Sequence, residues 1–175
     1  MSPPNPHVSV VIPTYQRRDQ VAVAIESVLT QSLEHLEVVV IDDGSTDGTV
    51  QHLRRRYGAE PRVRLVHRPN GGVARARNHG IREARAPLIA FLDSDDRALQ
   101  GRLARQAEAL DRAPEATLCI CDARFVDAEG RRIGSLQGHE HHRPPTSLRA
   151  MFAGAWGVPS TWMIRAEIAR DLLFD

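Results

Sequence analysis

The segment FLDSDD, from Phe91 to Asp96, places three carboxylates directly after the apolar run PLIA. Like charges this close together repel one another, and burying them is costly unless a positive charge lies beside them. Two interpretations are open. In the first, the acids are solvated in a turn and favour the N-terminus of the following helix. In the second, Asp93 and Asp95 hold a divalent cation, Mg²⁺ or Mn²⁺, which binds one or two carboxylates together with substrate phosphates.

Polar residues also follow two earlier apolar segments. PTYQRR begins at Pro13, at the end of the first of these segments, and DDGSTDG begins at Asp42, at the end of the second. If Asp42 is the last residue of a strand, Asp43 faces the edge of the sheet, where its carboxylate can accept a hydrogen bond from a base N–H. Tyr15 can either stack on a planar base or cover the core as a rim aromatic.

An arginine lies on the apolar side of the helix predicted over residues 73–85. Arg77 falls within the stripe that faces the sheet, which consists of Val73, Ala76, Gly80, Ile81 and Ala84. An inward-facing guanidinium needs an anionic partner, which is either a bound anion or one of the aspartates. The preceding Gly71 and Gly72 let a ligand approach the backbone closely, and a helix N-terminus favours an anion.

Strands and helices alternate over the first part of the chain. Apolar runs predict strands over residues 7–13, 36–42, 62–68 and 87–93, and helical periodicity predicts helices over residues 19–30, 50–57, 73–85 and 99–110. This alternation predicts an α/β fold with a mostly parallel sheet flanked by helices. Ligands bind beyond the carboxyl ends of the strands in such sheets, so the polar segments described above should share one rim.

The remaining residues, 113–175, predict a short antiparallel element after the acidic segment. A strand, a turn at DAEG and a returning strand come first, and STWMIR and AEIARDLL predict a last strand and a last helix. HEHH, from His139 to His142, is interpreted as a solvated loop, with a substrate or metal contact as the alternative. Trp162 is expected in the core, whereas for Trp156 core packing and a sugar-stacking surface are both open.

Composition limits the functions that are open to this chain. Its 175 residues suit one domain, and a formal net charge of +1 gives no general attraction to nucleic acid. The sequence contains no lysine, which excludes a lysine Schiff base and a P-loop lysine. No apolar run approaches the roughly 20 residues that cross a bilayer, and no signal peptide is recognised. We expect a cytoplasmic protein, with peripheral association at the cytoplasmic face of a membrane left open.

Taken together, three segments resemble family 2 glycosyltransferases of the GT-A fold. They are VSVVIPTYQRR with the following DDGSTDGT, then NGGVARARNHGI, then APLIAFLDSDD, and the match runs in order from Val8 to Leu110. The resemblance implies a Rossmann-like sheet, a nucleotide-sugar donor that is most often UDP-linked, a divalent metal, Mg²⁺ or Mn²⁺, and inversion at the anomeric carbon.

The same resemblance implies roles for individual residues, by their position in the motifs. Asp95 is the metal ligand of the DxD motif, and Asp93 lies nearer the ribose or a metal-bound water. Asp43 contacts the base and Arg77 lies near the nucleotide. The nucleotide pocket is lined by Pro13, Thr14 and Tyr15.

The catalytic base of the family is a carboxylate in an acidic motif that follows a segment similar to LLFD. The chain ends at Asp175 before such a motif, so we expect the base to lie beyond Asp175. We expect one GT-A domain over residues 1–175, truncated at the C-terminus, with a donor-binding part over residues 8–112 and a partial acceptor-side part over residues 113–175. The acceptor is a glycan, a lipid or a protein.

Two other classes of function stay open. One is a catalytically incomplete module that binds a nucleotide sugar without turnover, which the missing base favours. The other is a different phosphate enzyme on an α/β sheet, such as a nucleotidyltransferase, which the absence of lysine disfavours.

Overall fold

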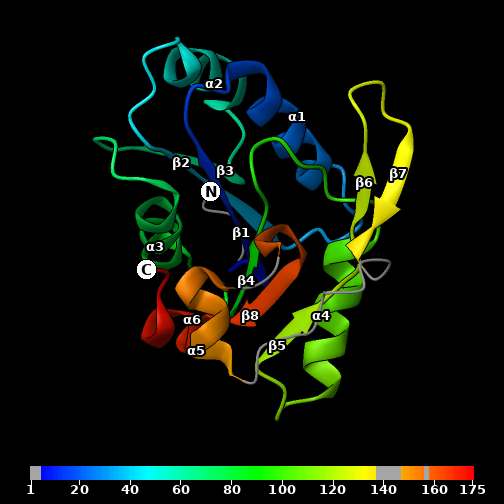
Figure 1. Ribbon diagram of the computed structural model, residues 1–175. Helices are drawn as coiled ribbons and strands as arrows, with labels where there is room; N and C mark the ends of the chain where they lie inside the picture. Colours follow the sequence, from blue (N-terminus) through cyan, green and yellow to red (C-terminus); the bar gives the residue numbers. More distant parts are fainter. Residues whose placement is uncertain (1–4, 137–146, 156–157) are drawn as a thin grey trace.

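A six-stranded sheet forms the centre of the protein in the computed structural model, which describes residues 5–136, 147–155 and 158–175 (Figure 1). The strand order is β3-β2-β1-β4-β8-β5, and β1 to β4 run parallel, whereas β8 is antiparallel to both of its neighbours. The predicted mostly parallel sheet with an antiparallel element is therefore confirmed. The strands are β1 (Val8–Thr14), β2 (Leu36–Asp42), β3 (Val63–His67), β4 (Leu88–Phe91), β5 (Leu118–Ile120) and β8 (Trp162–Arg165).

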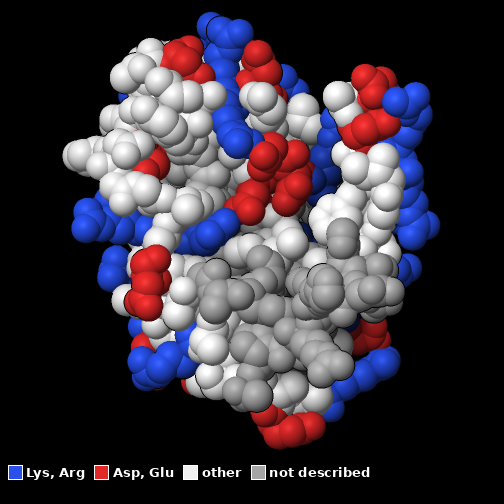
Figure 2. All heavy atoms as spheres, viewed as in Figure 1, with Lys and Arg blue, Asp and Glu red and all other residues white. Residues whose placement is uncertain are grey.

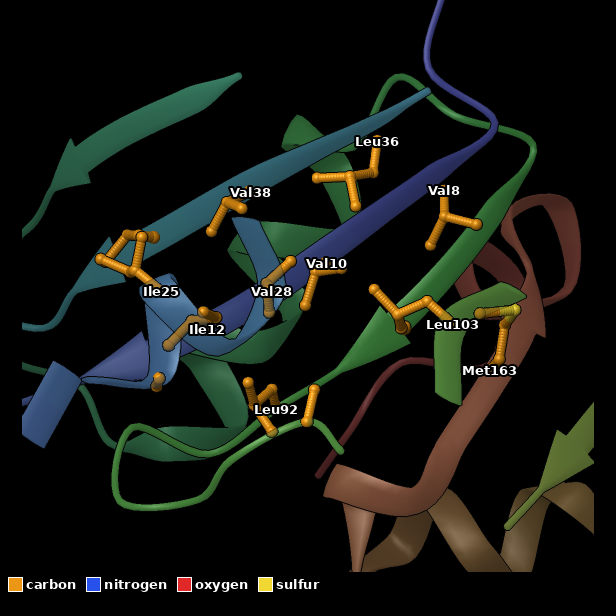
Figure 3. Packing of buried hydrophobic residues seen from close by; sticks show 14 of the residues in the cluster. Val8, Val10, Ile12, Ile25, Val28, Leu36, Val38, Leu92, Leu103 and Met163 are labelled. Atoms are coloured by element: carbon orange, nitrogen blue, oxygen red, sulfur yellow. The ribbon is translucent and has the colours of Figure 1, made fainter. Parts of the chain in front are cut away.

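Helices cover both faces of this sheet, which explains why β1 and β2 are buried along their whole length and are largely apolar. Three amphipathic helices lie on one face, namely α1 (Arg18–Leu29), α2 (Thr49–Tyr57) and α4 (Arg102–Arg112). Figure 3 shows side chains of this layer, among them Val10 and Ile12 of β1 next to Val28 of α1. On the other face lie α3 (Val73–Glu83) and α6 (Ala166–Leu172).

Aromatic side chains fill much of the second face. The ring centroids of Phe91 and Phe174 are 5.3 Å apart, edge to face, and those of Phe152 and Phe174 are 4.6 Å apart. Trp162 is 1% exposed, so the prediction that it packs in the core is confirmed. Phe152 comes from a π-helical turn (η2, Met151–Ala155) that follows the short α5 (Leu148–Ala150). Because these rings come from β4 and from segments far along the sequence, they join the middle of the chain to its C-terminal part.

Helix α3 approaches the sheet closely at Gly80. A Cβ atom on Gly80 would lie 2.2 Å from Cγ1 of Val11 in β1, so only glycine fits here without a shift. This approach brings the N-terminal end of α3 to the carboxyl ends of β1 and β2. The prediction that Val73 faces the sheet is wrong: this first residue of α3 is 53% exposed and lines a surface pocket.

The segment after α4 differs from the expected strand, turn and returning strand in one respect. The chain forms β5 in the main sheet and then a separate hairpin of β6 (Arg124–Val126) and β7 (Arg132–Ser135), which lies at the right of Figure 1. The predicted turn at DAEG is confirmed, with Gly130 at φ +80°. A short 3₁₀ turn (η3, Pro159–Thr161) precedes β8. His139 to His142 and Trp156 lie outside the described residues.

Within the described part of the chain, none of the helices has the length and apolar character needed to cross a bilayer.

Candidate functional site

A pocket of about 430 Å³ opens at the carboxyl ends of β1, β2 and β4, beside the N-terminal end of α3. Figure 2 shows acidic side chains gathered near the middle of this face of the molecule, with basic side chains beside them. All seven residues to which the family resemblance gave a donor-site or metal-binding role line this pocket. The lining residues are Pro13, Thr14, Tyr15, Arg17, Asp43, Asn70, Gly72, Val73, Ala76, Arg77, Asp93, Ser94 and Asp95.

The loops that follow β1 and β2 are held together by Gln16. Its Oε1 accepts hydrogen bonds from the backbone N–H groups of Thr46 (2.9 Å) and Asp47 (3.0 Å), and its Nε2 donates to Thr46 Oγ1 (2.9 Å). The backbone N–H of Gln16 donates to Ser45 Oγ at 2.9 Å, and the residue has φ +52°. Sequence reasoning missed this contact, which fixes the backbone on both sides of Gln16 and therefore the positions of its pocket-lining neighbours.

Asp43 holds the N-terminal end of α3 against β2. Its carboxylate accepts hydrogen bonds from the backbone N–H groups of Gly71 (3.1 Å) and Gly72 (2.7 Å), and Arg68 Nε lies 3.4 Å from Oδ1. The side-chain amide of Asn70 donates to the Asp43 carbonyl at 2.9 Å. The side chain of Asp43 is 5% exposed. Asp43 therefore has a clear structural role, and the predicted contact between its carboxylate and a base stays a prediction.

Arg77 forms an ion pair with Asp93, in which Nη2 lies 2.6 Å from Oδ1. An aspartate is therefore the partner of the inward-facing guanidinium in this structure, and the predicted position of Arg77 near a nucleotide stays a prediction. The guanidinium carbon lies 5.3 Å from the ring centroid of Phe174, and the side chain is 12% exposed. Asn78 fixes Phe174 in turn, because its amide donates to the Phe174 carbonyl and accepts from the Phe174 N–H, each at 2.7 Å. Phe174 thus supports the side chain of Arg77 in the pocket.

Asp95 forms an ion pair with Arg17, which sequence reasoning had not assigned to the site. Both side chains are about half exposed, at 51% and 42%. The only sequence signal for Arg17 is its place in PTYQRR, just past the end of a strand. The backbone of the DSD segment turns here, since the N–H of Asp96 donates to the Asp93 carbonyl at 3.0 Å. Asp93, Ser94 and Asp95 nevertheless all line the pocket.

The acidic segment creates a local negative potential. Burial is the largest effect on Asp96 and raises the pKa of its carboxyl group, and the charges of Asp93 and Asp95 raise this pKa further, whereas a hydrogen bond from Ser160 lowers it. Three carboxylates this close together favour a cation. Asp93 and Asp95 supply oxygen ligands on the pocket wall, which suits a hard divalent ion.

The described protein side chains do not form a complete metal site by themselves. Among the residues that the structure describes, no group of three or more His, Cys, Asp or Glu side chains could hold a metal ion. The sequence-based expectation is compatible with this finding, because it requires only one or two carboxylates together with ligand phosphates.

Comparison with models of protein families identifies the family of this chain. A family model described as "Glycosyl transferase family 2" matches residues 9–173. The chain belongs to glycosyl transferase family 2. The predicted family and the predicted GT-A fold are both confirmed.

Relatives of the chain include two synthases from Pasteurella multocida. A chondroitin synthase and a hyaluronan synthase are each 42% identical over 91 residues, which cover 52% of this chain and 9% of the relative. Among solved structures, S. aureus TarS 1-349 has a TM-score of 0.70 at 25% identity, over 94% of this chain and 48% of that chain. The mannosyltransferase PcManGT from Pyrobaculum calidifontis has a TM-score of 0.71 at 24% identity, over 95% of this chain and 46% of that chain.

This glycosyl transferase family 2 chain therefore spans a small part of these curated relatives and slightly less than half of these solved chains. Family membership agrees with the position of the pocket, since the matched residues include all of its lining residues. The individual roles predicted for Pro13, Thr14, Tyr15, Asp43, Arg77, Asp93 and Asp95 remain predictions.

Proposed function

We propose that this chain binds the donor of an inverting glycosyltransferase, which transfers a sugar from a UDP-linked donor to an acceptor hydroxyl with the help of Mg²⁺ or Mn²⁺. The observation that carries this proposal is the convergence of all the predicted donor-site residues, from four separate segments, on one pocket. Two solved relatives support it: TarS 1-349 is known in complex with UDP-GlcNAc, and PcManGT in complex with GDP-Man and Mn²⁺.

The nucleoside fits the side of the pocket that is formed by the ends of β1 and β2. Tyr15 is 48% exposed on the pocket rim and offers a flat surface for a base. Asp43 lies deeper and offers a carboxylate oxygen to a base N–H. Thr14 Oγ1 is buried and makes no hydrogen bond within the described structure, so a ligand could satisfy it.

The diphosphate fits the acidic side of the pocket, where Asp95 and Asp93 would hold the metal ion. When bound, the metal stabilises the negative charge that develops on the departing nucleoside diphosphate. Arg77 contributes a fixed positive charge beside Asp93, which helps to balance the carboxylate and leaves the pocket less repulsive to phosphate. The acceptor hydroxyl loses its proton to a carboxylate base, for which we propose no residue within this chain.

Isothermal titration with UDP, in the presence and absence of Mn²⁺, tests the proposal. The wild-type chain should bind UDP only when Mn²⁺ is present, and Asp95→Ala should weaken this binding at least about tenfold, because it removes a charged ligand of the metal. Asp171→Ala is the matched control, since Asp171 is an exposed aspartate that does not line the pocket.

The outcomes separate the parts of the proposal. UDP binding that depends on neither Mn²⁺ nor Asp95 would contradict the proposed donor site, in which Asp95 holds the metal ion beside the diphosphate. Tighter binding of GDP than of UDP would replace the UDP assignment while the rest stands. Hydrolysis of a UDP-sugar by the chain would show turnover, whereas binding without hydrolysis would favour a module that binds donor only.

A further inference from the structure

Two arginines line the donor pocket, and each neutralises one carboxylate of the DxD motif. They differ in their freedom to move. Arg77 is 12% exposed and lies against the ring of Phe174, so its guanidinium is confined. Arg17 is 42% exposed, and Asp95 is the one ion-pair partner that its side chain has in the described structure. An exposed ion pair of this kind is weak, because water competes for both charges.

The backbone at Arg17 is fixed even though its side chain is exposed. The preceding residue, Gln16, is clamped to the loop after β2, and the carbonyl of Arg17 accepts the first hydrogen bond of α1, from Val21 N–H at 3.0 Å. The guanidinium can therefore change its partner by side-chain rotation alone. Such a rotation needs no movement of the loops that line the pocket.

The charges of the pocket favour such an exchange. The lining residues comprise three carboxylates (Asp43, Asp93 and Asp95) and two guanidinium groups (Arg17 and Arg77). A divalent cation that binds alone makes the total charge of these five side chains and the ion positive, and it competes with Arg17 for Asp95. A diphosphate that arrives alone adds negative charge to a set that is already negative. When both arrive together the balance is unchanged, and the guanidinium displaced from Asp95 gains a phosphate partner.

We propose that Arg17 is a resident counter-ion of Asp95, which leaves this carboxylate when a divalent ion binds and then pairs with the diphosphate of the donor. This inference rests on the proposed function and adds a donor-positioning residue to it. It has one thermodynamic consequence: metal and nucleotide must strengthen each other's binding, by the same factor in both directions. Part of this coupling depends on Arg17.

The test measures Mn²⁺ and UDP binding separately. Electron paramagnetic resonance of free Mn²⁺ gives the affinity for the metal alone, and calorimetry gives the affinity for UDP at saturating Mn²⁺. In Arg17→Ala, the affinity for Mn²⁺ alone should rise about 2- to 5-fold, because the competing exposed ion pair is gone. The affinity for UDP should fall about tenfold, because a charged phosphate contact is lost.

Arg18→Ala provides the matched control. Arg18 is the next residue, is 51% exposed and pairs with Asp19, and it does not line the pocket. Both affinities should stay at the wild-type values in this variant. Arg17→Lys, which keeps the charge but loses the planar fork, should fall between wild type and Arg17→Ala for both ligands. It also serves as the test variant if Arg17→Ala does not fold.

Opposite shifts for the two ligands are the signature of the exchange. A purely structural role for Arg17 would weaken the binding of both Mn²⁺ and UDP. Weaker binding of both ligands, or no change in either, would overturn this inference. If the wild-type chain still binds UDP, the proposed function stands in either case. A wild-type chain that binds no UDP at any Mn²⁺ concentration would overturn the proposed function, and this inference with it.

Discussion

Replacing Gly80 by alanine should destabilise the protein and disturb the pocket proposed for the donor at the same time. The new Cβ atom would lie 2.2 Å from Cγ1 and 3.1 Å from Cγ2 of Val11, in a central strand that is fully buried. Ordinary carbon contacts need about 3.5 Å or more, so α3 must move away from β1 by roughly 1 Å. Helix α3 carries Arg77 and begins next to Gly72, so this shift reaches the contacts of Asp93 and Asp43.

The expected magnitude is the difference between two effects. Inserting a methyl group into a packed core costs about 1–3 kcal/mol. Alanine regains up to about 1 kcal/mol because it has a higher helix propensity than glycine. The net loss of about 1–2 kcal/mol corresponds to a fall in melting temperature of about 2–8 °C for a chain of this length. UDP binding in the presence of Mn²⁺ should weaken in parallel.

Thermal unfolding followed by circular dichroism measures this loss. Gly134→Ala is a suitable control, because a Cβ atom there would meet Phe125 at an ordinary distance of 3.6 Å and the melting temperature should change little. The double variant Gly80→Ala with Val11→Ala removes the clashing methyl groups, so it should be more stable than the sum of the two single effects predicts. A Gly80→Ala protein that melts at or above the wild-type temperature would refute the close packing of α3 on β1.

Three further predictions concern single side chains. Asp43→Ala should lower the unfolding free energy by about 2–4 kcal/mol, because it leaves two backbone N–H groups and Arg68 without their carboxylate; a change below about 0.5 kcal/mol in urea unfolding would contradict this. Burial and the neighbouring Glu26 raise the pKa of Tyr57 from 10.0 to about 12, so the stability that this group contributes is fully present below pH 10 and is lost as the pH rises towards about 12. Urea unfolding at several pH values should show this loss in the wild type and not in Tyr57→Phe, and lysine titration cannot interfere because the sequence has none. Asp96→Asn should raise the melting temperature at pH 7, because burial and the nearby acids raise the pKa of Asp96 and make its ionisation unfavourable in the folded state; a lower melting temperature would argue against this.

Much of the fold could be predicted because local patterns specify it. The apolar runs over residues 8–14 and 36–42 are long enough to indicate strands covered on both faces, and helical periodicity gives the intervening helices. The shared rim also followed from local information. Parallel strands place their carboxyl ends at the same edge, so the polar residues after each strand had to converge. This is why Asp43, Arg77 and Asp95 line one pocket although they are distant in sequence.

The parts that sequence reasoning missed depend on long-range contacts. The four residues of β8 do not reveal that this strand lies between β4 and β5, because short strands carry no signal for their partner. The ion pair between Arg17 and Asp95 joins the loops after β1 and β4, and the sequence pattern of either loop alone does not indicate its partner in the other. Val73 fits a helical stripe in the sequence, yet as the first residue of α3 it is 53% exposed, because a stripe does not show where along a helix the burial begins.

The position of β8 has a consequence for synthesis of the protein. On its side away from β1, strand β4 pairs with Trp162–Arg165, a segment that leaves the ribosome long after β4 itself. Until then an apolar strand of the nascent chain has an open edge that can pair with other chains. We therefore expect chaperones to associate with nascent chains that end before Trp162 and to be released once Arg165 has emerged.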